Sequence, residues 1–442
     1  MVEEKSILKT VLFRDFSKWN VNLYLKKFDI KYKWKPVSLE KIMRPRKERI
    51  KNKDYKGQFP IVEKIRFSDG KFFFREEKNP KTDLNVSCVN DLLVSNINFE
   101  KGAFAINTFE TIVTSTDYQS YELLVPIDFD YFNQILRTEK FLLQVKSLKS
   151  GGMKTRARYD FLKQFEIPVP PISEQKAIIQ KYQDTIFKAE AIEKEANFLL
   201  NDSHLYFDSL LQIEEIKPSF VSGLNFIHYK NIDLWGIDKN LCRKTIRNKK
   251  YKTVPLENLC SVGSGGTPSR NHSEYYRDGN IPWIKTTEVI DEIISDTEEK
   301  ITQKGLENSS AKLYEANSLI IAMYGQGKTR GRTAKLNVRA TTNQACAVLY
   351  DINEKLVNID YLWFYFQNEY ERIRELASGN NQPNLNAGMI KTYPIVLPPL
   401  LVQNEIVEHI NQIKAQVKDL RQQAKELREK AKLEFERSVF DE

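Results

Sequence analysis

The sequence is poor in the residues that usually build metal sites and disulfides. Only four cysteines and four histidines occur among 442 residues. No two cysteines form a Cys-x-x-Cys pair, and no two histidines stand at metal-ligand spacing. Widely separated cysteines of this kind are typical of reduced, structural thiols. The sequence therefore predicts neither a disulfide-stabilised secreted fold nor a metal site.

Long apolar stretches are also missing. The longest clearly apolar stretch, 319–323, is far too short to span a bilayer. The N-terminal residues 1–5 are charged and do not begin a signal peptide. We therefore expect a soluble, cytoplasmic protein.

Motifs for nucleotide binding and catalysis are incomplete. The segment 325–329, Gly-Gln-Gly-Lys-Thr, resembles the end of a P-loop, but Ala322 stands where that loop requires its first glycine. The glycine-rich segment 263–269 lacks the spacing and the following helix of a dinucleotide site. No Gly-x-Ser-x-Gly elbow occurs. We expect a non-catalytic chain with no cofactor of its own, in which both glycine-rich segments are flexible loops that present backbone amides to a surface.

Proline is absent from two long stretches, each of which follows a Pro-Pro pair. One lies between Pro171 and Pro218, and the other runs from Pro399 to the C-terminus. Apolar residues recur in both at alternating spacings of four and three, which is the heptad pattern of a coiled coil. Each helix could reach about 40 residues, on the order of 60 Å. The predicted seam comprises Ile178, Tyr182, Ile192, Leu199, Ile406, Ile410, Ile413, Val417, Leu420 and Leu427. We expect the helices to pair within the chain, with an intermolecular coiled coil as the alternative.

The chain repeats itself. Residues 150–199 align with 378–427 at a constant offset and without a gap, so that Gln175 falls on Gln403. A weaker match, 35–40 against 252–257, opens each half. The repeat predicts an α+β fold in which two similar α/β domains are separated by two long antiparallel helices, with pseudo-two-fold symmetry. The predicted segments are a first globular domain, 1–165, a central helix, 166–217, a second globular domain, 218–395, and a C-terminal helix, 396–442. Two similar halves suit a target with two separated half-sites.

Local patterns refine this picture within each domain. Residues 130–145 are predicted to form one helix. Residues 318–324 are predicted to form a buried strand that leads into a glycine-rich, basic loop. The prolines of 167–171 predict an extended exit from the first domain.

Positive charge is in excess. Lysine and arginine exceed aspartate and glutamate by 9, which favours a polyanionic partner, although a solvated basic surface is an equal alternative. Arginine, lysine, asparagine and glutamine have donor patterns that match base edges, and lysine and arginine also hold phosphates. The candidate DNA-contacting residues are Arg44, Arg46, Lys47, Arg49, Arg156, Arg158, Thr267, Lys285, Thr286, Gln326, Lys328, Arg330, Arg332 and Asn384.

Four stretches carry a family resemblance. They are 263–269 with 281–285, 322–325 with 341–346, 167–171 with 174–175, and 395–399 with Gln403. With the duplicated layout, they resemble the DNA specificity subunit of type I restriction-modification systems. The resemblance implies two target recognition domains that read a gapped DNA sequence. It also implies that the helices set the spacing and dock two modification subunits. Those subunits would carry the S-adenosylmethionine chemistry of DNA methylation, and a restriction subunit could join.

Two alternatives stay open at this point. The chain could be the recognition subunit of another restriction or phage-defence assembly, which keeps the DNA role and changes the partners. It could also be a coiled-coil scaffold with two protein-binding domains and no specific duplex. The first domain departs from the family pattern, because residues 44–52 stand where the second has its Gly-Gly-Thr-Pro loop.

Overall fold

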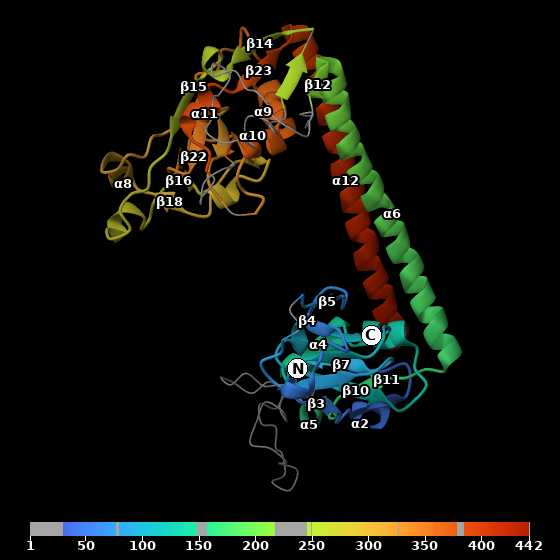
Figure 1. Ribbon diagram of the computed structural model, residues 1–442. Coiled ribbons are helices and arrows are strands. Elements are labelled where there is room, and N and C mark those ends of the chain that lie inside the picture. The colour runs from blue at the N-terminus through green and yellow to red at the C-terminus, as the bar shows by residue number, and fades with distance from the viewer. Residues whose placement is uncertain are drawn as a thin grey trace, which may run out of the picture. The chain divides into compact units, whose positions relative to one another are not determined.

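A computed structural model of the protein describes residues 30–76, 79–147, 157–216, 245–248, 250–325, 327–377 and 384–441 (Figure 1). The chain divides into two compact units. The first unit contains residues 1–193 and 422–442, and the second unit contains residues 194–421. Each unit therefore combines a globular part with one stretch from each of two long helices.

The first unit holds two large sheets. One has the strand order β2-β10-β7-β8 and the other β3-β6-β9-β4-β5, while β1 pairs with β11. The strands are β1 (Pro36–Ser38), β2 (Met43–Pro45), β3 (Arg49–Ile50), β4 (Ile61–Ile65), β5 (Phe72–Phe74), β6 (Leu84–Ser87), β7 (Leu92–Ser95), β8 (Phe104–Ile106), β9 (Ile112–Thr114), β10 (Tyr118–Leu123) and β11 (Glu166–Pro168). The helices are α2 (Leu39–Ile42), η2 (Asn52–Asp54), η3 (Phe99–Lys101), α3 (Phe129–Ile135), α4 (Glu139–Ser147) and α5 (Tyr159–Leu162).

The second unit holds sheets of order β15-β22-β19-β20-β17 and β18-β16-β21, together with the pairs β12-β13 and β14-β23. The strands are β12 (Ile213–Ile216), β13 (Thr245–Asn248), β14 (Lys252–Pro255), β15 (Ser261–Ser264), β16 (Ile281–Ile284), β17 (Ile293–Ile294), β18 (Lys300–Ile301), β19 (Leu319–Ala322), β20 (Thr333–Leu336), β21 (Thr341–Thr342), β22 (Cys346–Tyr350) and β23 (Pro394–Leu397). The helices are η5 (Leu256–Asn258), η6 (Ser273–Tyr275), η7 (Thr286–Glu288), α8 (Gln303–Glu307), α9 (Ile359–Asn368), α10 (Tyr370–Leu376) and α11 (Ala387–Lys391). Strand β19 is fully buried, as its continuous apolar sequence predicts.

The two globular parts share one topology. The antiparallel order β2-β10-β7-β8 in the first unit is repeated as β15-β22-β19-β20 in the second. A parallel pair also recurs, β4 with β9 in the first unit and β16 with β21 in the second, and the second unit has a further parallel pair, β17 with β20. In each unit, one strand pairs with the strand that leads to a long helix: β1 with β11, where Val37 lies opposite Ile167, and β14 with β23, where Val254 lies opposite Ile395. The predicted α+β fold with two similar domains is confirmed.

Two 40-residue helices, α6 (Ile172–Leu211) and α12 (Leu400–Val439), lie side by side (Figure 1). In the first unit, Lys181 Nζ lies 3.4 Å from Glu434 Oε2, and Arg428 Nη1 lies 3.3 Å from Glu193 Oε2. Later residues of α6 thus lie beside earlier residues of α12, so the two helices run in opposite directions. In the second unit the same order holds, because Asn197 accepts a hydrogen bond from Arg421 and the ring of Tyr206 lies 3.9 Å from that of His409. The predicted antiparallel coiled coil is confirmed.

Small residues allow the two helices to approach closely. Ala189 is fully buried in the first unit, and Ala196 is fully buried in the second. In the second unit Ala196 packs with Ile413 and Val417, and Leu199 and Leu420 border the cluster. The apolar seam therefore faces the partner helix, while charged residues occupy the outer faces.

A buried glutamine joins each long helix to its own domain. Gln175 accepts a hydrogen bond from the backbone N of Asp128 at 2.8 Å and donates to Pro170 O at 2.8 Å. Gln403 accepts from the backbone N of Asn358 at 2.7 Å and donates to Pro398 O at 2.8 Å. Asp128 and Asn358 are the N-caps of α3 and α9. The aligned glutamines thus hold the same helix N-cap in both units.

The single helix predicted over 130–145 is wrong in one respect. The structure has two helices there, 129–135 and 139–147, with a break around Arg137. The guanidinium of Arg137 donates to the carbonyl oxygens of Phe67, Gly102 and Phe104 at 2.7–3.0 Å. Burial lowers the pKa of this arginine to about 10. The break places that charge where three carbonyl oxygens accept its hydrogen bonds.

No helix in the described part of the chain is long and apolar enough to cross a membrane. Within the same residues, no group of three or more histidine, cysteine, aspartate or glutamate side chains could hold a metal ion.

Candidate nucleic-acid interface

Several loops of the second unit meet at one end of the sheet. The N of Met323, which follows β19, donates to Ala345 O at 2.8 Å, and the N of Leu385 donates to Met323 O at 3.1 Å. The hydroxyl of Thr267 donates to the side chain of Gln344. Since the N of Asn343 also binds Ile284 O, the loop after β16 reaches the same place. Four predicted residues are thereby brought to one edge: Thr267, Lys285, Thr286 and Asn384.

The glycine-rich segment before this edge is held tightly, so the expectation of a flexible loop is wrong for it. The N of Gly266 donates to Thr342 O at 2.8 Å, and the indole of Trp283 donates to Gly266 O at 3.0 Å. A Cβ on Gly265 would lie 1.8 Å from Thr342 O. Glycine is required there because two backbone segments touch. The segment fixes Thr267 in place rather than closing on a ligand.

The basic loop between β19 and β20 folds back on α10. The hydroxyl of Tyr370 donates to Lys328 O at 2.7 Å, and Arg374 Nη2 donates to Gly327 O at 2.8 Å. Burial, and then the nearby positive charge of Arg374, lower the pKa of Arg330. Lys328 is exposed and forms no ion pair with the described residues. Burial and like charge both disfavour the charged form of Arg330, so an anion bound beside Arg330 and Arg374 would be stabilising.

Other cations at this edge already have acidic neighbours. Lys285 Nζ lies 2.7 Å from Glu298 and 3.0 Å from Glu299. Arg270 Nη1 lies 2.7 Å from Glu299, and its guanidinium stacks 5.1 Å from the ring centre of Trp283. The positive charge of Lys285 is therefore largely offset within the protein, whereas that of Lys328 is not.

In the first unit, residues 46–49 take the place of the glycine-rich segment. The N of Arg46 donates to Ser120 O, which corresponds to the pairing of Gly263 with Val348 in the second unit. Arg46 Nε and Nη2 bind the two carboxylate oxygens of Asp91 at 2.5 and 2.9 Å. Arg44 pairs with Glu122 at 2.6 Å. Both arginines therefore have a structural partner.

The remaining cations of the first unit are more open. Lys47, Arg49 and Arg158 are exposed and form no ion pair with the described residues. Arg156 of the first unit and Gln326 of the second were also predicted as DNA contacts, and both lie outside the described residues.

The sequence reasoning passed over Gln344, Tyr370 and Arg374. Tyr370 and Arg374 stand four residues apart on α10, so one helix face carries both, but nothing local indicates that the loop 327–331 rests on that face. Gln344 lies in the Thr-Thr-Asn-Gln stretch at the end of β21, and its place within 341–346, which carries the family resemblance, was the available signal.

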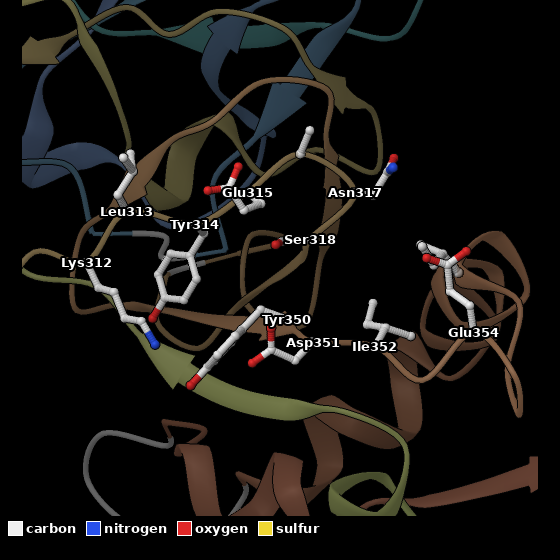
Figure 2. A pocket seen from close by; sticks show the side chains of 12 residues that line it. Lys312, Leu313, Tyr314, Glu315, Asn317, Ser318, Tyr350, Asp351, Ile352 and Glu354 are labelled. Atoms are coloured by element: carbon white, nitrogen blue, oxygen red, sulfur yellow. The ribbon is translucent and has the colours of Figure 1, made fainter.

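A shallow hollow of about 430 Å³ lies elsewhere on the second unit (Figure 2). Lys312 Nζ lies 4.0 Å from the ring centre of Tyr350 and 5.3 Å from that of Tyr314. The lining also includes Glu315 and Asp351. Acidic groups together with a tyrosine-bound lysine do not favour a polyanion, so this hollow is not part of the candidate interface.

Comparison with known proteins assigns the arrangement. Residues 248–429 match the family model of the type I restriction modification DNA specificity domain. The chain is also 26% identical over 179 residues to the Escherichia coli type I restriction enzyme EcoR124I/EcoR124II specificity subunit, across 39% of this chain and 44% of that one. It is 24% identical over 291 residues to the Methanocaldococcus jannaschii MjaIX specificity subunit, across 64% and 62%.

The alignments thus span about half the length of these relatives. A chain from a solved structure of the assembly and conformational transition of the type I R-M system is 17% identical. It superposes with a TM-score of 0.58 over 93% of this chain and 98% of that one, so the two share a fold. The family predicted from the sequence, type I specificity subunits, is confirmed by these matches.

Proposed function

We propose that the chain is the DNA-reading, non-catalytic specificity subunit of a type I restriction-modification complex. One observation carries the proposal: the specificity domain matched over 248–429 has its strand order repeated in the first unit. Two domains of one design in one chain suit a bipartite, gapped duplex. Each domain would read one half-site.

The charges of the candidate interface support a DNA ligand. The reading edge of a unit is here the part of that unit that carries its candidate DNA contacts. Lys328 and Arg330 of the second unit, and Lys47 and Arg49 of the first, are the cations that would contact phosphates. Phosphate contacts fix the position of a protein on a duplex, while polar contacts to base edges specify sequence. Thr267, Gln344 and Asn384 supply short polar groups at that same edge.

The partners follow from the relatives, which are named as subunits of restriction enzymes. We expect two modification subunits to dock on this chain and to bring S-adenosylmethionine, so that the chain itself needs no cofactor. A restriction subunit would complete a phage-defence enzyme. A complex that marks chromosomal DNA would act in the cytoplasm.

Two alternatives predict different results. The recognition subunit of another phage-defence assembly would bind the same kind of duplex with other partners. A coiled-coil scaffold would bind no specific duplex. A selection from random duplex DNA, with the modification subunits present, separates the scaffold from both DNA-reading roles.

The decisive experiment co-expresses the full chain with the modification subunit of its system in a host that lacks adenine methylation. Methylated adenines are then mapped across the genome. We expect a two-part motif with a spacer of fixed length, and no methylation when either protein is omitted. Methyl transfer by the purified chain alone, or methylation without a gapped motif, would contradict the proposal.

A further inference from the structure

Arg332 stands at the base of the basic loop, where the chain enters β20. Its Nε lies 3.1 Å from Asp291 Oδ2, and about a third of the side chain is exposed. Within the described residues, the structure records no hydrogen bond from its two terminal nitrogens. The paired donors at the end of the guanidinium are therefore available to a ligand.

Asp291 is itself fixed before any ligand arrives. Its Oδ1 accepts hydrogen bonds from the N and the hydroxyl of Thr333 at 2.9 and 3.1 Å. Its own N donates to Thr333 O at 2.7 Å. The backbone of Asp291 is left-handed, with φ 66°, a conformation that aspartate tolerates better than most residues. The direction from which its carboxylate meets Arg332 is therefore set by the fold.

This pair is anchored to two helices. The indole of Trp363, on α9, donates to the Thr333 hydroxyl at 3.0 Å. Gln367, also on α9, donates to Asp291 O at 3.4 Å and accepts from Lys414 of α12 at 2.8 Å. A side chain held through helices and a strand is positioned more sharply than one carried by a loop alone.

Arg46 of the first unit shows the other way in which an acid can hold an arginine. Asp91 binds both Nε and Nη2 of Arg46 and is itself 2% exposed. That arrangement uses a complete donor edge of the guanidinium inside the protein. The recorded contact of Asp291 with Arg332 is at Nε, and among the described residues no hydrogen bond from the terminal nitrogens is recorded, so this contact orients the group and leaves its outer edge open.

We infer that Arg332 reads a guanine in the half-site of the second unit, and that Asp291 is the positioning residue that orients it. In the major groove guanine presents two adjacent acceptors, N7 and O6, and two parallel arginine donors match them. Because the guanidinium is already oriented, less side-chain freedom is lost on binding. The inference rests on the proposed function, since it specifies how the second unit reads DNA.

The test uses the full chain with its modification subunit and a plasmid library in which each base pair of the motif is randomised. Methylation of each variant site is measured by sequencing. Arg332→Ala should relax one position, a G·C pair in one half-site only, by about 5- to 150-fold in discrimination. Asp291→Asn should relax the same position, and should add nothing in the Arg332→Ala background. Arg332→Lys, which keeps the charge but loses the paired donors, should also fail to discriminate.

Asp360→Asn is the matched control. Asp360 forms an ion pair with Lys335 of β20, whose Nζ lies 2.6 Å away. The substitution therefore removes a nearby acid–cation pair without touching Arg332, and tests whether lost stability alone changes the motif. It should leave the motif unchanged, and melting temperatures of all variants show whether folding is altered.

Several results would overturn the inference. A relaxed position that is not G·C would refute guanine reading. Uniformly weaker methylation of all sites by Arg332→Ala would show a phosphate contact. An unchanged motif in Asp291→Asn would refute the positioning role. If the wild-type chain with its modification subunit gave no two-part motif at all, the proposed function would fail, and the inference with it.

Discussion

The two globular parts have the same framework and different reading edges. In the second unit the loop between β19 and β20 carries three cations in residues 323–332. In the first unit the loop between β7 and β8 holds the 3-10 helix η3, with Phe99 buried and only Lys101 as a cation. Yet the backbone hydrogen bonds beneath the two loops are the same. In the first unit, Asn96 N donates to Asp117 O at 2.8 Å and Ala157 N donates to Asn96 O at 2.8 Å. In the second unit, Met323 N donates to Ala345 O and Leu385 N donates to Met323 O.

This comparison separates two requirements on the sequence. Buried strands and the glutamine at the start of each long helix are constrained by packing and by hydrogen-bond partners. The loops above them are solvated, so their residues can differ between the halves at little cost in stability. Under the proposed function, different loops on one framework would allow one chain to read two unlike half-sites.

The largest expected effect comes from exchanging one reading edge entirely. Replacing residues 218–395 by the equivalent domain of another specificity subunit should change one half-site completely and leave the other intact. Adenine-methylation mapping of the chimera measures this. A change in both half-sites, or in neither, would refute the assignment of one domain to one half-site.

Lengthening both helices should alter the spacer alone. Seven residues, which keep the four-three register of the seam, would be inserted into α6 and α12 at the level where Ala196 packs against Ile413 and Val417. The added length is about 10 Å, close to three base-pair steps at about 3.4 Å each. The mapped motif should keep both half-sites with a longer gap. Unchanged spacing, or altered half-sites, would contradict the model.

Removing the glutamine of one half should destabilise that half. Gln403→Leu leaves the Asn358 N and the Pro398 and Leu356 carbonyls without their side-chain partner, which should cost about 3–5 kcal/mol of unfolding free energy. Gln175→Leu should cost somewhat less, since it frees two backbone groups. Urea unfolding measures both. A near-zero cost in only one variant would show that the shared contact matters in one half alone.

Lys414 makes the stability of the second unit depend on pH. The aligned position of the first unit is Ile186, which does not titrate. Burial lowers the pKa of this lysine to about 8, so above pH 8 the unfolded chain binds more protons than the folded one, and stability should rise towards pH 10.4. Lys414→Met lacks this titration. Its stability advantage over the wild type should be largest below pH 8, as much as about 3 kcal/mol, and should shrink at higher pH. A pH-independent difference in melting temperature between the two proteins would contradict the burial of a titrating lysine.

The smallest effects concern single phosphate contacts. Lys328→Ala in the second unit and Lys47→Ala in the first should each weaken binding on all sequences alike and reduce the salt slope by about one. Lys285→Ala is the control, because Glu298 and Glu299 already offset its charge. If Lys285→Ala and Lys328→Ala reduced the salt slope equally, the ion pairs of Lys285 with Glu298 and Glu299 would have to break when DNA binds.

Regular patterns were readable from the sequence because they depend on neighbours along the chain. The four-three spacing predicts the paired helices, and the constant offset between Gln175 and Gln403 predicts two domains of one design. The apolar run before Tyr324 predicts a buried strand. Each of these follows from periodicity or repetition, which packing of one element against another preserves.

The tertiary structure alone decided which cations face outward with their charge free. Arg46 and Lys47 are adjacent in sequence, yet Asp91, 45 residues away, binds the first and leaves the second exposed. Arg332 and Asp291 lie 41 residues apart and meet only because β17 pairs with β20. Likewise the helix break at Arg137 depends on distant carbonyls. Ion pairs and hydrogen bonds over such separations depend on the sheet register, which no local pattern of residues specifies.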